Sequence, residues 1–555
     1  MKQMSRGLYR LIVLFFLIIM AGLFISSLIS TVVLSEFRQT LEDGTQEVVL
    51  NHSYYLADYP LVHFLLFSVL SILAFCAGKH RLRGITDGSC GWKISSLCLA
   101  AAVGAVMIIA ASSAPRFDQA RVVEIAEAFT RQDYSAAGTG GYLNYSPYQI
   151  GIVRYYYFLS LLFGPGRFIA FQWADLVLML AADYFLLNTA EKLMPDISGI
   201  IVPVLLAFFL PWHFHAVYLY GNTTGTSLLI ISLLFFFRYI RRPSIADGLL
   251  SSVFMALCCA MKSNFYIFLI AEMLVITSVM LEAMVSRDGR TWLKYALGII
   301  LTLLMVLIVR SFNYSCLRKI RGGVPPEGMP AVGWIAMGLQ DNHSAPGWYN
   351  AYVDKLFAMH QYDAEATKQA ALQDIVKYLS FYRNNPRTAV GFFTRKIQSQ
   401  WNNPTFGMFY MLNPYSGAQW IHSPVFQRIL SALMNCFQTL LYGFSLFEAW
   451  VLLKKKNFST GEFFVMTAFI GGFLFQLMWE GNCINTVPFV LLLIIPAAAG
   501  IMNYLRVLAG ADARRLWRIL LLTALFAAVL TAACRLEFFW KLFGRRDDTG
   551  SFILF

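Results

Sequence analysis

Long apolar stretches alternate with short polar segments along most of the chain. A helix needs about 20 mainly apolar residues to cross the hydrocarbon core of a bilayer, so each stretch predicts a membrane-spanning helix. About 13 spans are expected on this criterion, near residues 11–34, 61–78, 94–112, 168–188, 197–215, 222–238, 247–261, 264–285, 293–311, 427–453, 460–480, 484–505 and 516–535. The pattern therefore predicts an all-α integral membrane protein.

Composition and charge agree with this class. The 555 residues are 58 % hydrophobic and carry a formal net charge of +13. The basic residues cluster in short loops, such as RYIRRPS (238–244) and SRDGRTWLK (286–294), as the positive-inside rule predicts for cytoplasmic loops. The charge therefore needs no nucleic-acid partner, and none is expected. The predicted topology places the N-terminus inside and the C-terminus outside.

The cysteines and histidines give no sign of a metal centre. Nine cysteines are scattered along the chain without a CxxC pair, and no His/Cys cluster has the spacing of a zinc site. No disulfide framework, metal or cofactor is expected.

Polar regions divide the chain into four parts. These are an N-terminal transmembrane hairpin (1–93), a larger transmembrane module (94–312), an extracytoplasmic loop domain (313–426) and the C-terminal transmembrane helices (427–555). The loop domain has ordinary polarity, with amphipathic helices expected over 364–382 and 390–401. It is too short for an independent enzyme domain but long enough to cover a cavity.

The first outer loop, residues 113–167, is expected to hold two surface helices on the outer face. Apolar residues recur at helical spacing from 119 to 129, which predicts an amphipathic helix on the membrane. The aromatic, Gly-rich turn TGGYLNYSPYQIG follows, and 155–163 form the second helix. The apolar run beside Arg154 has only about ten residues, too few for a span. A crossing there would also move RYIRRPS to the outside, against the charge rule.

Asp118 is the strongest candidate for chemistry. It lies shortly after the end of the third predicted span, facing the aromatic turn. An acid at such a position is usually a solvated cap, and Glu124 and Glu127 farther along the same helix are alternative bases. The run D-Q-x6-A-x-A-F, the turn Y-x-x-Y-x-P-Y-Q-x-G and the closing L-L-F-G resemble the first outer loop of bacterial polytopic (GT-C type) glycosyltransferases, which include O-mannosyltransferases and aminoarabinose transferases. The resemblance implies that Asp118 is the catalytic carboxylate.

Lys262 lies at the outer junction of two predicted spans. A snorkelling lysine is the ordinary explanation; the functional one is a contact to the phosphate of a lipid-linked donor, which a cation at headgroup level suits. The family often carries a basic residue in a segment like A-x-x-x-K-x-N. Arg116 and Arg121 are weaker candidates for the same role.

Several polar and aromatic residues are candidate cavity-lining groups. Tyr220 and Asn222 are expected to donate and accept hydrogen bonds there; Asn222 stands where the family often has an acid. Nearby His213 and His215 are expected to form a polar interface pair rather than a metal site.

Glu480 follows a tryptophan at the outer end of a span, as in the W-E of many relatives, but Ile484 and Asn485 replace the Arg-Tyr that follows there. Trp348, Tyr349 and Asn350 resemble the family's G-W-Y-N pattern, and Lys396 and Trp401 its K-x3-Q-W pattern. Aromatic and amide groups suit sugar faces and hydroxyls, although packing explains the tryptophans equally well.

The resemblance implies a glycosyltransferase that moves a sugar from a polyprenyl-phosphate donor to an acceptor on the extracytoplasmic side of the cell membrane, with inversion. The sugar remains open, and so does the acceptor, which is a glycan, lipid or protein. One alternative is a transporter or flippase of lipid-linked saccharides, for which Asp175 and Asp183 within a span are the only hints. Another is a polymer ligase or polymerase of a different fold.

Overall fold

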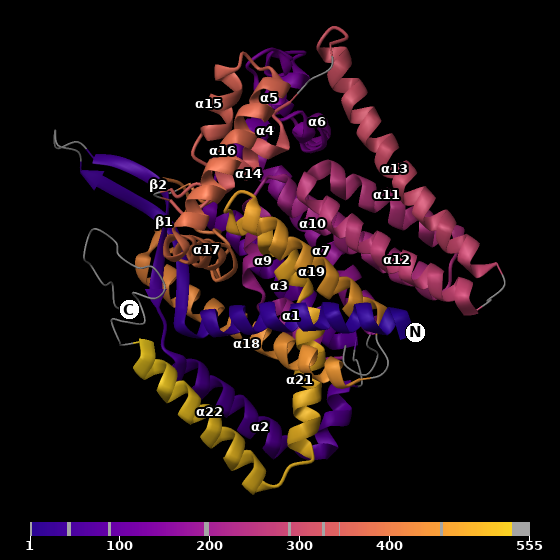
Figure 1. The fold of residues 1–555 in the computed structure, drawn as a ribbon, viewed down its shortest axis with the longest axis vertical. Helices are drawn as coiled ribbons and strands as arrows, with labels where there is room; N and C mark the ends of the chain where they lie inside the picture. The colour runs from indigo at the N-terminus through magenta and orange to yellow at the C-terminus, as the bar shows by residue number, and fades with distance from the viewer. Residues whose placement is uncertain are drawn as a thin grey trace.

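The computed structural model describes residues 3–40, 46–86, 90–193, 199–286, 290–324, 328–342, 344–413, 415–455 and 459–534. These residues form helices and one antiparallel hairpin (Figure 1). The elements up to the first outer loop are α1 (Gln3–Ile29), β1 (Ser30–Thr40), β2 (Gln46–Ala57), α2 (Pro60–Thr86), α3 (Cys90–Ala111), α4 (Asp118–Thr130), α5 (Tyr142–Tyr145) and α6 (Ile150–Phe163).

The middle of the chain contributes α7 (Phe168–Leu193), α8 (Ile201–Phe208), α9 (Leu210–Phe214), α10 (Gly221–Arg241), α11 (Ile245–Met261), α12 (Tyr266–Ser286) and α13 (Thr291–Ile320). The loop domain holds α14 (Ala331–Gly338), α15 (Tyr352–Met359), α16 (Ala364–Asn384) and α17 (Pro386–Trp401). The chain continues with α18 (Pro424–Lys454), α19 (Thr460–Met478), α20 (Val487–Leu492), α21 (Ile494–Ala509) and α22 (Ala513–Cys534).

Helices that could cross a membrane dominate the described residues. Nine are long and apolar enough, and the bent pair formed by 483–492 and 494–509 makes up to ten. Two apolar helical stretches, Pro60–Leu73 and Ile245–Met261, are shorter. The prediction of a helical multi-pass membrane protein is thus confirmed, whereas the count of about 13 spans stays a prediction.

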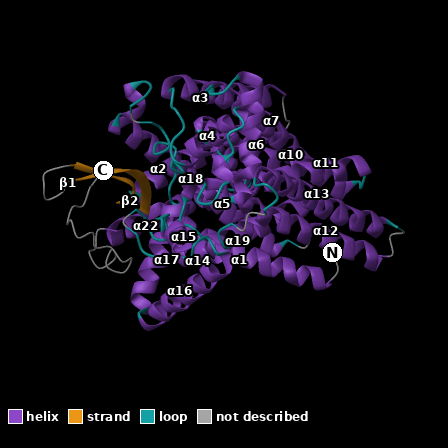
Figure 2. Cartoon of the chain, turned by 90° about the horizontal axis from the view of Figure 1, so that it is seen from above, coloured by secondary structure: helices purple, strands orange, loops and turns teal. Residues whose placement is uncertain are grey.

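Two predicted spans end differently in the structure. The first does not reach residue 34, because α1 ends at Ile29 and the chain passes directly into β1, where the Val32 N–H donates to the Asn402 carbonyl (3.0 Å). The outer loop expected there is instead the antiparallel pair β1–β2, which projects from one edge of the molecule (Figure 2). The run STVVL is apolar enough for a helix, but its β-branched residues favour a strand.

The predicted span near 197–215 is broken. Its residues form α8 and the five-residue α9, separated at Phe209. Pro211 at the start of α9 has no N–H to donate, so one continuous helix is disfavoured. The break lets Trp212 and His213 turn toward Asp183 of α7.

Close helix packing positions the start of α10 and the end of α11. A Cβ at Gly221 would clash with the Met261 carbonyl, and one at Gly151 of α6 would clash with the Ala260 carbonyl. Only glycine therefore permits these approaches. They bring the start of α10 and the start of α6 against the last residues of α11, directly before Lys262.

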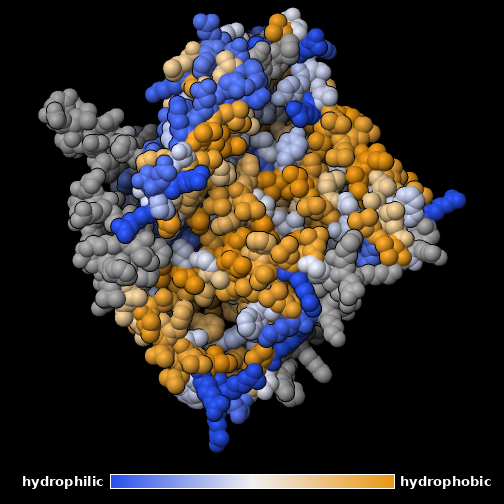
Figure 3. All heavy atoms as spheres, viewed as in Figure 1, coloured by the Kyte–Doolittle hydropathy of each residue, from blue (hydrophilic) through white to orange (hydrophobic). Residues whose placement is uncertain are grey.

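The predicted surface helices form one layer with the loop domain. The helix expected over 119–129 is α4, and that over 155–163 is the longer α6; the loop-domain helices are α16 and α17. In Figure 2, α4 and α6 lie on one side of α5 and α14–α17 on the other. Figure 3 shows hydrophilic residues gathered over this layer and a largely hydrophobic face over the long helices below it.

Candidate functional site

The structure brings Asp118, Lys262 and Glu480 together, although they are far apart in the sequence. They come from the start of α4, the end of α11 and the segment after α19. Asp118 and Glu480 both act on the pKa of Lys262, and Lys262 acts on the pKa of each carboxyl group. The charge of Asp118 also helps raise the pKa of Glu480. Sequence reasoning predicted all three as site residues, without showing that they meet.

Asp118 begins α4 beside a turn in the backbone. Phe117, with a φ of 53°, precedes it, and the Phe117 ring stacks on Tyr410 at 5.0 Å. The Asp118 side chain is exposed to solvent, and its Oδ2 accepts a hydrogen bond from the Tyr220 hydroxyl at 3.3 Å. Desolvation by the surrounding protein raises the pKa of Asp118, although the Lys262 ammonium and the Tyr220 hydroxyl act in the opposite direction.

Tyr220 joins the carboxylate of Asp118 to the ammonium of Lys262. The Gln149 amide donates to the Tyr220 oxygen at 2.5 Å, which leaves the tyrosine proton directed at Asp118. The Lys262 ammonium lies 4.7 Å from the centre of the Tyr220 ring, an attractive cation–π arrangement.

Asn222 holds Lys262 in this position. Its Oδ1 accepts from the Lys262 ammonium at 2.7 Å, and its Nδ2 donates to Asn485 Oδ1 at 3.1 Å. Burial lowers the pKa of Lys262 to about 8, although Glu480 and Asp118 raise it. Asn485, which replaces a residue of the family pattern, is thus part of the same network.

A buried lysine fixes the segment that carries Glu480. The Lys396 ammonium is fully buried and donates to the carbonyls of Gly338 and Trp479. The Gly481 N–H donates to the Gly347 carbonyl at 2.7 Å, and a Cβ at Gly481 would clash with the Pro346 carbonyl. Burial raises the pKa of Glu480, against the effect of Lys262, and lowers the pKa of Lys396 to about 7.

The two arginines predicted as site residues have other partners. Arg116 donates to the carbonyls of Leu412 (2.6 Å) and Tyr410 (3.4 Å), which ties the α4 turn to the loop domain. Arg121 is 68 % exposed and lies 3.9 Å from Glu124 on the same helix. Arg121 still contributes to the field at Asp118.

The side chains of the GWYN segment differ in burial. Trp348 is buried against Tyr410, and the Asn350 amide donates to Gln340 at 2.8 Å, so both organise the loop. Tyr349 is exposed, and its ring lies 6.5 Å from Trp334. The negative charges of Asp118 and Glu480 reach Tyr349 and help raise its pKa, after burial and Asp354.

Sequence reasoning missed Asp354. It accepts a hydrogen bond from the Tyr349 hydroxyl, and its charge helps raise the pKa of Asp118. Burial raises the pKa of Asp354 itself. The signal available in the sequence was an acid four residues after Asn350, at the start of what is α15.

The histidines weighed as metal ligands lie buried at the end of α9, beside α7. His213 Nε2 lies 3.2 Å from Asp183 Oδ2, with both side chains fully buried. No group of three or more His, Cys, Asp or Glu residues with metal-binding geometry occurs in the described part of the chain.

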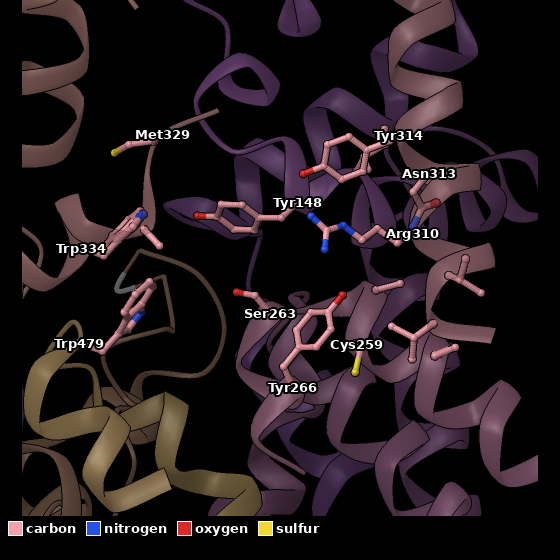
Figure 4. A pocket seen from close by; sticks show the side chains of 16 residues that line it. Tyr148, Cys259, Ser263, Tyr266, Arg310, Asn313, Tyr314, Met329, Trp334 and Trp479 are labelled. Carbon is pink, nitrogen blue, oxygen red and sulfur yellow. The ribbon is translucent and has the colours of Figure 1, made fainter. Parts of the chain in front are cut away.

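A groove of about 260 Å³ adjoins this cluster. Its lining includes Ser263, Tyr148 and Trp479, which are sequence or spatial neighbours of Lys262, Asp118 and Glu480 respectively. Figure 4 shows polar groups along one part of the groove and the Trp334 and Trp479 rings at the opposite end. Those two rings stack at 6.2 Å.

No protein-family model matches the chain, and a search of curated proteins finds no significant similarity.

Proposed function

We propose that the protein is a membrane glycosyltransferase that moves a sugar from a polyprenyl-phosphate donor to a hydroxyl acceptor, on the extracytoplasmic side and with inversion. The observation that supports this proposal most is that Asp118, Lys262 and Glu480 lie close enough to influence one another, beside a groove with polar and apolar lining. A lipid-linked sugar needs both environments, because its sugar is polar and its chain is apolar.

In the proposed reaction, Asp118 accepts the proton of the acceptor hydroxyl as that oxygen bonds to the anomeric carbon. The bond between this carbon and the phosphate oxygen breaks, and its electron pair leaves with the phosphate. The leaving group is a stable anion, so no second carboxylic acid has to protonate it, unlike in glycosidases. The Tyr220–Asp118 hydrogen bond fixes the orientation of the base.

In this proposal, Lys262, Glu480 and three aromatic rings bind the phosphate and the sugar of the donor. The Lys262 ammonium, held by Asn222, stabilises the charge that develops on the phosphate. Glu480 accepts hydrogen bonds from sugar hydroxyls while its charge keeps Lys262 protonated. The Tyr349, Trp334 and Trp479 rings offer flat apolar surfaces for the sugar.

The test uses the purified full chain in lipid nanodiscs with a panel of polyprenyl-phosphate sugars and a membrane extract as the source of acceptors. Release of sugar-free polyprenyl phosphate, detected by mass spectrometry, reports turnover without knowledge of the acceptor. A mass shift in an extract component then identifies that acceptor. Movement of intact lipid-linked sugar between leaflets, with no release, would instead support a flippase.

A further inference from the structure

Arg310 is a charged residue within a candidate membrane span and lines the groove beside the candidate site. It lies roughly 28 Å beyond Thr291 along α13, since a helix rises about 1.5 Å per residue. That distance nearly equals the thickness of the hydrocarbon core, about 30 Å. If α13 enters the membrane at Thr291, Arg310 therefore reaches the level of the opposite headgroups, where lipid phosphates lie.

Arg310 has no anionic partner among the described residues. Its guanidinium lies 5.6 Å from the centre of the Tyr314 ring, and no described carboxylate forms a salt bridge with it. Figure 4 shows the guanidinium extending into the groove toward Tyr148. A cation that lines a groove within a candidate span and faces no described counter-charge is a candidate for binding an anionic group.

The rest of the groove fits the two parts of a lipid phosphate. The groove lining that contains Arg310 also includes the polar residues Tyr314, Asn313 and Ser263. Farther along, the wall is apolar and comes from α11 and α13, with Ala256, Ala260, Val306 and Val309. An anion that continues into an apolar chain would satisfy both regions.

The neighbouring cluster of Asp118, Lys262 and Glu480 supplies no surplus positive charge for a phosphate. Lys262 is influenced by two carboxyl groups, those of Glu480 and Asp118, and the Lys396 ammonium is buried against backbone carbonyls. A phosphate beside these groups needs a further cation. Arg310 is the groove-lining side chain that can supply it, because a guanidinium binds two phosphate oxygens at once.

We propose that the groove between α11, α12, α13 and α14 binds a polyprenyl phosphate, with Arg310 paired to its phosphate and the chain along Val306 and Val309. This inference rests on the proposed function, since it assigns the donor's phosphate and lipid to one part of the molecule. The phosphate then lies at the end of the groove nearest Asp118, Lys262 and Glu480, with Arg310 on the lipid side and Lys262 on the sugar side.

Binding is measured by displacement of a fluorescent polyprenyl phosphate from the full chain in nanodiscs, with sugar-free polyprenyl phosphate, polyprenol, phosphatidylglycerol and inorganic phosphate as competitors. Arg310→Ala should weaken polyprenyl phosphate binding roughly 10- to 100-fold, the usual effect of losing a charged hydrogen-bonding partner. Arg310→Lys should recover part of that loss. Lys319→Ala, which removes an exposed cation from the same helix, should bind normally.

Val309→Trp narrows the apolar wall without removing charge, so it should weaken polyprenyl phosphate binding and leave any competition by inorganic phosphate unchanged. Equal competition by inorganic phosphate and by the lipid would overturn the chain-binding part and indicate a simple anion site. Equal competition by phosphatidylglycerol would replace the donor with bulk membrane lipid.

The outcomes also separate this inference from the proposed function. Normal polyprenyl phosphate binding by folded Arg310→Ala, in a protein that transfers sugar, would overturn the groove assignment alone. Arg310-dependent binding without sugar transfer from any donor in the panel would overturn the proposed function and leave the groove assignment in place.

Discussion

Two regions of the molecule contain carboxylates that accept hydrogen bonds from side chains, and their exposure differs. Asp183 in α7 is fully buried and accepts from the Trp212 indole at 2.9 Å and faces His213 at 3.2 Å. Asp175 lies nearer the start of the same helix and accepts hydrogen bonds from the hydroxyls of Tyr155 (2.7 Å) and Tyr156 (2.9 Å). Asp118 instead remains accessible to solvent, and its charge influences the pKa values of Lys262 and Glu480.

The difference separates carboxylates that hold helices together from one that can react. The partners of Asp175 come from α6 and α10, and those of Asp183 come from α9, so these acids connect the neighbouring helices to α7. They have no opening to a substrate. Asp118 has an opening, a fixed hydrogen-bond donor and a nearby cation, which are the requirements for a positioned base. It follows that acids within a span are weak support here for a transport pathway.

The largest expected effect is that of Asp118→Asn. The amide keeps the size of the side chain and removes its basicity, so release of polyprenyl phosphate should fall ~10²- to 10⁴-fold, the usual contribution of a general base. Binding of sugar-free polyprenyl phosphate should survive. Turnover is measured with the nanodisc assay.

Two matched controls lie on the same helix. Glu124 pairs with Arg121, and Glu127 accepts from the Gly166 N–H at 2.8 Å, so Glu124→Gln and Glu127→Gln should turn over nearly normally. Normal turnover by Asp118→Asn would remove the proposed mechanism, and a loss confined to either glutamate variant would move the base along α4.

Lys262 should set the alkaline limit of the reaction. With a pKa lowered to about 8, its ammonium loses its proton as the pH rises through that value. Turnover should therefore fall above about pH 8. Lys262→Met should lower turnover at neutral pH roughly 10²- to 10³-fold, the range seen when one preorganised donor is removed.

Lys262→Arg provides the control for this limit, because a guanidinium keeps its proton at any pH used. The variant should retain part of the activity and lose the fall above pH 8. A Lys262→Arg profile identical in shape to that of the unaltered protein would assign the alkaline limit to another group.

Asp183→Ala tests the other side of the comparison. It leaves the Trp212 N–H and the His213 ring without their buried partner, which should cost roughly 2–4 kcal/mol of stability. Thermal unfolding in detergent should occur at lower temperature, while turnover per folded molecule stays the same. A specific loss of turnover with unchanged unfolding would give Asp183 a functional role and blur the distinction.

Regular helices were predictable from the sequence, whereas meeting points and interruptions were not. The pattern of Val122, Ile125 and Phe129 predicted α4 to within about one residue at each end, because one apolar stripe determines a surface helix. The hairpin β1–β2 was missed, since an apolar run with Val32 and Val33 suits a helix or a strand. The break before Pro211 was indicated by the proline itself, but the long apolar stretch around it favoured the prediction of one continuous span.

The site was only partly predictable for a related reason. Asp118, Lys262 and Glu480 each stand at the end of an apolar stretch, where a charge attracts attention. Asp354 and the structural role of Lys396 depend on how the loop domain folds over the spans, which no local pattern encodes. Arg310 likewise resembles an ordinary span-end charge until the groove around it is known.

The smallest effect is expected for Arg121→Gln, which asks whether closeness in sequence to Asp118 suffices for a role. Arg121 is 68 % exposed, pairs only with Glu124 at 3.9 Å within the described contacts, and influences Asp118 less than Lys262 does. Exposed ion pairs typically contribute about 0–1 kcal/mol, so turnover and polyprenyl phosphate binding should each change less than about fivefold. The change should also shrink as salt is raised, because an exposed charge is screened, whereas the effect of Lys262→Met should persist in salt. A large, salt-independent loss of turnover or binding in Arg121→Gln would mean that the reactive site includes the exposed face of α4.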